Sequence, residues 1–173
     1  EGTPKSPDAI VLDSISGKLV LAFIEVKSSQ PKYTDLVRGD VRGVREHWVA
    51  RLIGETGKAP RAVRQIDRAI NEFKEGRLRI PGVDPQAVET IYPVVVTMDH
   101  WPIRLTLYDK FADDVANLDL LCQQSVAPVE VISCHDLEIL VAMTENGESL
   151  VGMLRQRQLA GLQSNPIRDS SDS

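Results

Sequence analysis

Apolar residues near the start of the chain are grouped in two short runs. Residues 9–13 (AIVLD) and 19–27 (LVLAFIEVK) have the composition of β-strands, and the turn-forming segment 14–18 (SISGK) joins them. The second run is apolar on both faces until Glu25, which is typical of a central strand with a covering layer on each side. The sequence therefore predicts a β-hairpin whose second strand lies inside a sheet.

Farther along the chain, apolar residues recur at helical spacing. One stripe predicts a helix over 34–54, which Gly39 and Gly43 weaken. The stripe consists of Val37, Val41, Val44, Trp48 and Leu52. A second helix is expected to begin at Pro60 and to end near Gly76. Its inward-facing residues are expected to be Val63, Ile66, Ile70 and Phe73.

The rest of the chain mixes strand-like and helical segments. The remaining elements are expected to be strands over 88–98 and 128–132, and helices over 111–122, after Ser133 and over 148–159. Pro93 indicates an edge strand or an interrupted ladder, and Ser133 with Asp136 fits a capping box. Strands mixed with helices in this way predict an α/β sandwich with a central mixed sheet flanked by helices.

Length and composition indicate one soluble globular domain. The chain has 173 residues, and we expect a domain over 1–163 followed by a disordered polar tail over 164–173. The longest apolar run, 19–24, is far shorter than the roughly 20 residues of a membrane span, so no membrane partner is expected. No secretion signal opens the sequence. Cys122 and Cys134 are expected to be free thiols, as in a reducing cytoplasm.

Charge is distributed unevenly along the sequence, although the net charge of −5 does not suggest a polyanionic partner. Residues 27–79 contain 13 of the 20 Lys and Arg residues and only 7 of the 25 Asp and Glu residues, a surplus of six positive charges. The remainder has a surplus of eleven negative charges. Such asymmetry favours a polyanion such as nucleic acid on one face of the protein.

Two groups of arginines within that segment are candidate contacts to a phosphate backbone. Each group has helical spacing, and the members are Arg38, Arg42 and Arg45 in the first and Arg61, Arg64 and Arg68 in the second. The alternative is a solvated helix face, in which nearby acids such as Asp35, Asp40, Asp67 and Glu72 partly neutralise the arginines. The residues themselves leave both interpretations open.

The predicted hairpin brings three charged residues together. If Ser16 and Gly17 form a two-residue turn, the paired positions place Asp8 opposite Glu25, on the same side of the sheet. Lys27 lies two residues beyond Glu25 and shares that side. Two close carboxylates repel unless a positive charge lies between them, and Mg²⁺ prefers such oxygen ligands. The arrangement is typical of a metal site for phosphodiester hydrolysis, with a structural ion pair as the alternative.

The same residues carry a resemblance to a known family. Pro7-Asp8, a hairpin and then Glu25-Val26-Lys27, in the stretch "IEVKSS", resemble the signature of the PD-(D/E)XK nuclease superfamily, which has a restriction-endonuclease-like fold. The match covers residues 7–98. The resemblance implies a metal-dependent nuclease, more often an endonuclease than an exonuclease, that acts on DNA more often than on RNA.

The resemblance also implies a role for each matching residue. Asp8 and Glu25 would bind Mg²⁺, or Mn²⁺ as a substitute, with the backbone carbonyl of Val26 as a further ligand. Lys27 would assist the attacking water. In the family the helix after this strand often offers a Gln or a basic residue to the site, and Gln65 is the candidate here.

The sequence departs from the family pattern at its start. That fold normally begins with a helix and a strand before the hairpin, sometimes with one more acid, but only six residues precede Pro7. We expect those elements to belong to a larger protein or to a partner chain, unless the topology is altered. A homodimer is also open, because many enzymes that cut both strands require one.

Two other classes of function remain as alternatives. The first is an inactive nuclease-like module that binds nucleic acid or a partner protein. The second is an interaction domain in which the acidic half, residues 80–173, docks elsewhere. No His-based metal cluster and no Ser/His/Asp order is visible in the sequence.

Overall fold

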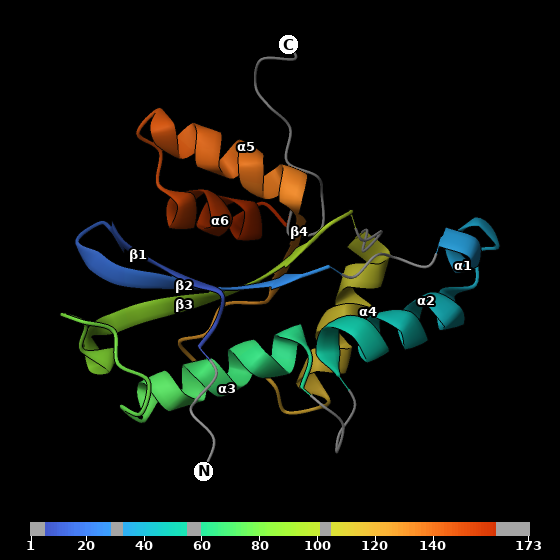
Figure 1. The fold of residues 1–173 in the computed structure, drawn as a ribbon, viewed down its shortest axis with the longest axis horizontal. Coiled ribbons are helices and arrows are strands. Elements are labelled where there is room, and N and C mark those ends of the chain that lie inside the picture. Colours follow the sequence, from blue (N-terminus) through green and yellow to red (C-terminus); the bar gives the residue numbers. More distant parts are fainter. Residues whose placement is uncertain (1–5, 29–32, 55–59, 101–104, 162–173) are drawn as a thin grey trace.

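The computed structural model describes residues 6–28, 33–54, 60–100 and 105–161 (Figure 1). Its centre is a sheet of four strands in the order of the sequence: β1 (Ala9–Ile15), β2 (Lys18–Lys27), β3 (Val88–Thr97) and β4 (Glu130–Ser133). β1 pairs antiparallel with β2, whereas β2 with β3 and β3 with β4 pair in parallel. The predicted α/β class and the mixed central sheet are therefore confirmed.

The hairpin has the register that the sequence predicts. Ser16 and Gly17 form the two-residue turn with φ values of 54° and 78°, as a turn that matches the twist of the two strands requires. The paired residues run from Ile15 with Lys18 to Ala9 with Ile24. One step farther along the same register, Asp8 stands opposite Glu25.

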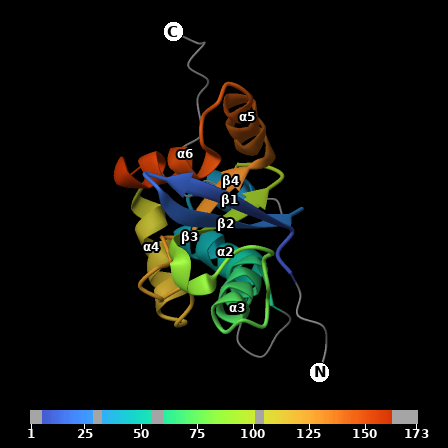
Figure 2. The ribbon, with the colours of Figure 1, turned by 90° about the vertical axis from the view of Figure 1, so that its left-hand side faces the viewer.

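Helices cover both faces of the sheet, in three layers (Figure 2). They are α1 (Tyr33–Val37), α2 (Val41–Trp48), α3 (Ala62–Lys74), α4 (Leu105–Ala116), α5 (Cys134–Glu145) and α6 (Leu150–Leu159). Helices α2, α3 and α4 lie on one face, and α5 and α6 lie on the other (Figures 1 and 2). β2 has an apolar side chain at nearly every position because it contributes to a core on each face.

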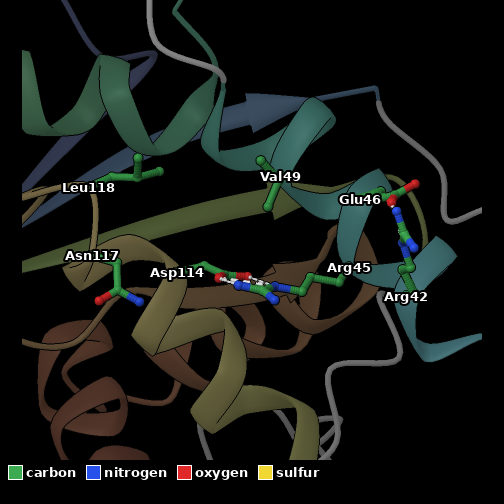
Figure 3. Close-up of a pocket in the computed structure, with 7 residues that line it drawn as sticks. All are labelled: Arg42, Arg45, Glu46, Val49, Asp114, Asn117 and Leu118. Atoms are coloured by element: carbon green, nitrogen blue, oxygen red, sulfur yellow. Dashed lines mark hydrogen bonds and ion pairs between the residues drawn. The ribbon is translucent and has the colours of Figure 1, made fainter.

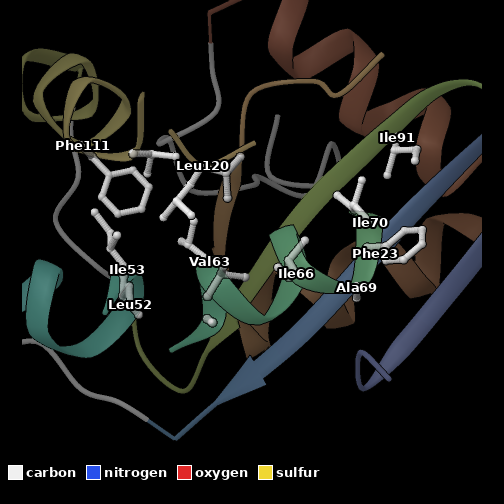
Figure 4. Packing of buried hydrophobic residues seen from close by; sticks show 14 of the residues in the cluster. Phe23, Leu52, Ile53, Val63, Ile66, Ala69, Ile70, Ile91, Phe111 and Leu120 are labelled. Carbon is white, nitrogen blue, oxygen red and sulfur yellow. The ribbon is translucent and has the colours of Figure 1, made fainter. Parts of the chain in front are cut away.

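The larger core lies between the sheet and helices α2 to α4. Phe23 of β2 packs against Phe73 of α3 with the ring centroids 5.9 Å apart, and Ile66 and Ile70 are fully buried beside them (Figure 4). Burial of each such side chain stabilises the fold by about 1.5–3 kcal/mol. The inward-facing residues predicted for this helix are all buried, so that prediction is confirmed.

The helix predicted over 34–54 is wrong as a continuous element. α1 ends at Val37, Gly39 adopts a φ of 67°, and the Asp40 side chain then caps α2 by accepting a hydrogen bond from the Gly43 amide. The chain continues from α2 into a π-helical turn over Val49–Ile53. The break leaves Val37 87% exposed, so the predicted apolar stripe begins only at Val44.

Two other predictions need correction. Pro93 does not mark an edge strand, because β3 lies between β2 and β4; the ladder to β4 does begin only at Val94, so the expected interruption is present. The helix predicted over 111–122 spans Leu105–Ala116 instead. The capping box is confirmed. The Ser133 hydroxyl accepts a hydrogen bond from the backbone N–H of Asp136, and the Asp136 carboxylate accepts one from the backbone N–H of Ser133.

Three simpler expectations can also be compared with the structure. Both cysteines are free. Within the described residues, no helix is both long and apolar enough to cross a bilayer. The tail predicted to be disordered, 164–173, lies outside the described residues.

Candidate functional site

A buried ion pair lies at the carboxyl end of β2. Glu25 and Lys27 follow the core residues Leu21 and Phe23 at two-residue spacing along β2, so all four side chains point toward the face that α2 and α3 cover. Lys27 Nζ is 2.6 Å from Glu25 Oε1, and the Glu25 side chain is only 1% exposed. Lys27 is 22% exposed, so the pair opens to solvent on the lysine side.

Asp8 directly precedes β1 and is hydrogen-bonded to the neighbouring strand. Its Oδ2 atom accepts a hydrogen bond of 2.8 Å from the backbone N–H of Val26. Beyond the last pair of the β1–β2 ladder, Ala9 with Ile24, the Asp8 carboxylate thus accepts the hydrogen bond that a backbone carbonyl of β1 would otherwise accept. The N–H and C=O groups of an extended residue point to the same strand edge, so the Val26 carbonyl also faces the side of Asp8.

This set of oxygen atoms fits a hard divalent cation by its chemistry. It combines two carboxylates with one backbone carbonyl, and Mg²⁺ is commonly held by one or two carboxylates while it keeps several waters. The same geometry also fits the structural alternative, because Lys27 already balances the charge of Glu25. A second acid on the facing strand favours a metal site, since a simple ion pair does not need one, but Asp8 also has a structural role as the acceptor for the Val26 N–H.

Gln65 lies in the second turn of α3, at the end of the helix that faces the site. Figure 4 shows α3 crossing β2 with Val63 toward the arrowhead and Ile70 beside Phe23. The amino-terminal end of α3 thus lies near the carboxyl end of β2. Among the described residues, the buried Oε1 atom of Gln65 accepts no hydrogen bond. A buried acceptor without a donor is rare and indicates a place for a donor such as water.

Most of the arginines predicted to contact a phosphate backbone form hydrogen bonds or ion pairs with other groups of the protein. Arg42 pairs with Glu46 and Arg68 pairs with Glu72, each at 2.8 Å, and Arg64 donates to the Gly54 carbonyl at 3.0 Å. The Arg42–Glu46 pair is exposed on both sides, so it stabilises little and exchanges readily with other partners. The Arg68–Glu72 pair differs, because the Glu72 side chain is only 7% exposed.

The break between α1 and α2 changes the first arginine group. Arg38 follows α1 and does not share the face of α2 with Arg42 and Arg45. The prediction of one continuous row of three is therefore wrong. Arg61 is exposed and precedes the first residue of α3.

Sequence reasoning missed a buried acid that anchors Arg45. The Asp114 carboxylate of α4 accepts hydrogen bonds from the Arg45 guanidinium and from Trp48 Nε1, the latter at 3.1 Å. Burial alone would raise the pKa of Asp114, but the bonds from Arg45 and Trp48 outweigh it and lower this pKa. The sequence does contain a signal for a buried acid at this position, because Asp114 lies on the apolar helical stripe formed by Phe111, Val115 and Leu118.

A pocket of about 760 Å³ opens between α2 and the end of α4 (Figure 3). Its lining residues are Arg42, Arg45, Glu46, Val49, Asp114, Asn117 and Leu118. Figure 1 places α2 and α4 on the side of the molecule where β2 and β3 end. The pocket and the Glu25–Lys27 pair therefore lie on the same face and toward the same end of the sheet.

A further polar cluster joins the loop after β3 to α5. His100 Nδ1 lies 3.2 Å from Asp136 Oδ2, and His100 Nε2 lies 3.4 Å from the Ser133 hydroxyl. The sequence order did not suggest this proximity. Ser133 is 2% exposed and its hydroxyl is engaged in the helix cap, so the cluster is structural and presents no accessible nucleophile.

Comparisons with family models, with curated proteins and with solved structures found no match to this chain. In the part of the chain that the structure describes, no group of three or more His, Cys, Asp or Glu side chains is placed to hold a metal ion. A divalent cation at Asp8 and Glu25 would therefore have at most two carboxylates from the described residues and would depend on a carbonyl, waters or substrate oxygens.

Proposed function

We propose that the protein is a Mg²⁺-dependent nuclease of the PD-(D/E)XK type that cleaves DNA internally. One observation carries the proposal: Asp8 and Glu25 occupy opposed positions of the hairpin, with the Lys27 ammonium 2.6 Å from Glu25. The order of a hairpin, helices and a parallel strand also agrees with the elements over which the resemblance extends. Mn²⁺ is expected to substitute for Mg²⁺.

Each residue has a distinct task in this proposal. Asp8 and Glu25 would hold the cation with the Val26 carbonyl, and the Val26 N–H keeps the Asp8 carboxylate at the edge of β2. The bound ion would polarise a phosphate oxygen and lower the pKa of a water molecule. Lys27 carries a positive charge on the solvent side of Glu25, where it can orient the attacking water and offset negative charge on the phosphate.

The substrate would be held by basic residues on the same face of the sheet. Arg42 is exposed and pairs with Glu46, an exposed acid on the same helix, whereas Arg68 pairs with the buried Glu72. A phosphate group can replace Glu46, because an exposed pair contributes little stability. Gln65 would accept a hydrogen bond from water near the site through its buried Oε1 atom.

The proposal is tested by incubating the protein with circular and linear DNA, single- and double-stranded, in Mg²⁺, in Mn²⁺ and in a chelator. Cleavage of circular DNA with either metal, and none with the chelator, is expected. Asp8→Asn, Glu25→Gln and Lys27→Met should each lower the rate by at least about 100-fold. Glu130→Gln is the matched control, because it makes the same change in another buried glutamate of the sheet that pairs with a cation at the same 2.6 Å distance. Full activity of Glu25→Gln would refute the assignment.

The second candidate is an inactive module that binds nucleic acid. The observation in its favour is that the Glu25–Lys27 pair is charge-balanced by itself. In that case DNA would bind in a salt-sensitive way and would remain intact with every metal. Asp8→Asn would then leave DNA binding unchanged.

A further inference from the structure

We propose that the pocket between α2 and α4 binds a single nucleotide unit of an unpaired DNA strand. The inference rests on the proposed function, because it assumes that nucleic acid is the ligand of this face. It goes beyond that function by assigning a nucleotide-binding site to a pocket whose lining residues come from α2, α4 and the segments that follow them, outside the hairpin. The site combines a fixed guanidinium, an exchangeable guanidinium and an apolar floor (Figure 3).

Arg45 is the fixed guanidinium. Its Nε and Nη2 atoms donate to the Asp114 carboxylate, which is buried and also held by Trp48 Nε1. Arginine has five N–H donors, so this fork leaves donors for a ligand. The Arg45 side chain is 54% exposed although its partner is buried, and it lines the pocket. Because the Asp114 carboxylate already fixes the Arg45 guanidinium, this side chain loses little conformational entropy when it binds a ligand.

Arg42 is the exchangeable guanidinium. It lies one turn before Arg45 on α2, and its partner Glu46 is itself largely exposed. The four charged side chains of the pocket are balanced, two positive and two negative. A polyanion is therefore not attracted by net charge here. A single phosphate that displaces Glu46 from Arg42 would suit the site.

The floor of the pocket is apolar. Val49 and Leu118 are partly buried and pack on the larger core, and both line the pocket. Asn117 lies beside Leu118 and offers an amide with both donors and an acceptor. An apolar surface next to an amide suits a planar base, which needs stacking or van der Waals contact on its face and hydrogen bonds at its edge. A nucleotide brings that base and a phosphate together in one unit.

The location agrees with a role in holding the substrate strand. α2 and α4 lie on the same face of the sheet as Glu25 and Lys27, toward the end where β2 finishes. A base in a duplex is stacked and cannot enter a pocket, so the ligand must be unpaired. The structure thus favours a single strand, a flap or a frayed end over an intact duplex.

The test uses the full chain in a chelator, so that it does not depend on cleavage. The probe is a fluorescein-labelled thymidine hexanucleotide, and binding is followed by anisotropy and by the NMR signal of the Trp48 indole N–H, identified with Trp48→Phe. We expect Arg42→Ala and Asn117→Ala each to weaken binding by about fivefold to tenfold. The Trp48 signal should shift in the wild-type protein.

Three controls make the result interpretable. Lys18→Ala removes an exposed, paired cation at the turn end of the hairpin and should leave the affinity unchanged. An abasic hexanucleotide should bind more weakly than the thymidine one, and a duplex should leave the Trp48 signal in place. Equal losses for Lys18→Ala and Arg42→Ala, or equal affinity for the abasic strand, would overturn the pocket assignment. Cleavage with an unchanged Trp48 signal would refute this inference and keep the proposed function, whereas strand binding without cleavage would do the reverse.

Discussion

Two glutamates in this protein are equally buried and equally close to a cation, and only one of them is a candidate for catalysis. Glu25 pairs with Lys27 and Glu130 pairs with Arg157, each at 2.6 Å and each with a glutamate that is 1% exposed. Glu25 faces the larger core, whereas Glu130 lies on the face that α5 and α6 cover. Burial and pairing are therefore equal at the two sites.

The difference lies in what surrounds each pair. Glu25 has a second carboxylate, Asp8, opposite it on the neighbouring strand, and its cation is 22% exposed. Arg157 is only 12% exposed. The pKa of Glu130 is raised to about 7, mainly by burial. The positive charge of Arg157 opposes this increase, and the negative charge of Asp136 adds to it. A buried charge pair does not by itself indicate a site. The features that suggest chemistry at Glu25 are an acid at the opposed position of the neighbouring strand and a cation that reaches solvent.

The largest expected effect is the loss of either cation. Arg157→Ala and Lys27→Ala each remove the cation 2.6 Å from a buried carboxylate, and we expect each to lower the free energy of unfolding by about 3–5 kcal/mol at pH 8. Addition of Mg²⁺ should restore part of that loss in Lys27→Ala, because Asp8 and Glu25 can then bind the ion. No restoration is expected in Arg157→Ala. Urea unfolding with and without Mg²⁺ measures both, and equal responses to the metal would remove the distinction.

An intermediate effect is expected from pH. The pKa of Glu130 is about 7 in the folded protein and has an ordinary value near 4.5 when the chain is unfolded. The folded state therefore binds the proton more tightly between these values, so this contribution is fully present below about pH 4.5 and is lost as the pH rises through 7. The loss amounts to roughly 3 kcal/mol. Unfolding free energies measured at several pH values should show this slope in the wild-type protein and not in Glu130→Gln; the same slope in both would contradict the explanation.

The smallest effect is expected at Asp8. Asp8→Ala removes the acceptor for the Val26 N–H at the end of the ladder and should cost about 1 kcal/mol of stability. Asp8→Asn keeps an oxygen at that position and should cost less. Both variants lose the carboxylate, so both should lose metal-dependent activity. Thermal unfolding separates the structural role of Asp8 from its role at the metal, and activity in Asp8→Asn would show that the carboxylate is not needed.

Much of the hairpin could be predicted from the sequence because local rules determine it. Ser16 and Gly17 specify a two-residue turn, and the turn fixes every paired position up to Ala9 with Ile24. The proximity of Glu25 and Lys27 follows from the alternation of side chains along a strand. The two-sided cover of β2 was visible in its uninterrupted apolar run.

The helical region was harder to predict because tertiary contacts decide it. The pattern over 34–54 suggested one helix, but the Asp40 cap and the left-handed backbone at Gly39 divide it. Arg45 contacts Asp114, which is 69 residues away, and no local pattern predicts that pairing. The arginines could be recognised as basic helix residues, whereas their partners and the pocket depend on how α2 packs against α4.

The most direct test of the central claim is the binding of Mn²⁺ to the protein, measured by isothermal titration calorimetry without any nucleic acid. We expect the wild-type protein and Glu130→Gln to bind the ion with the same affinity. The double variant that combines Asp8→Asn and Glu25→Gln should show no binding at the hairpin. Retention of the wild-type affinity in that double variant would contradict the claim that the two opposed carboxylates hold a divalent cation.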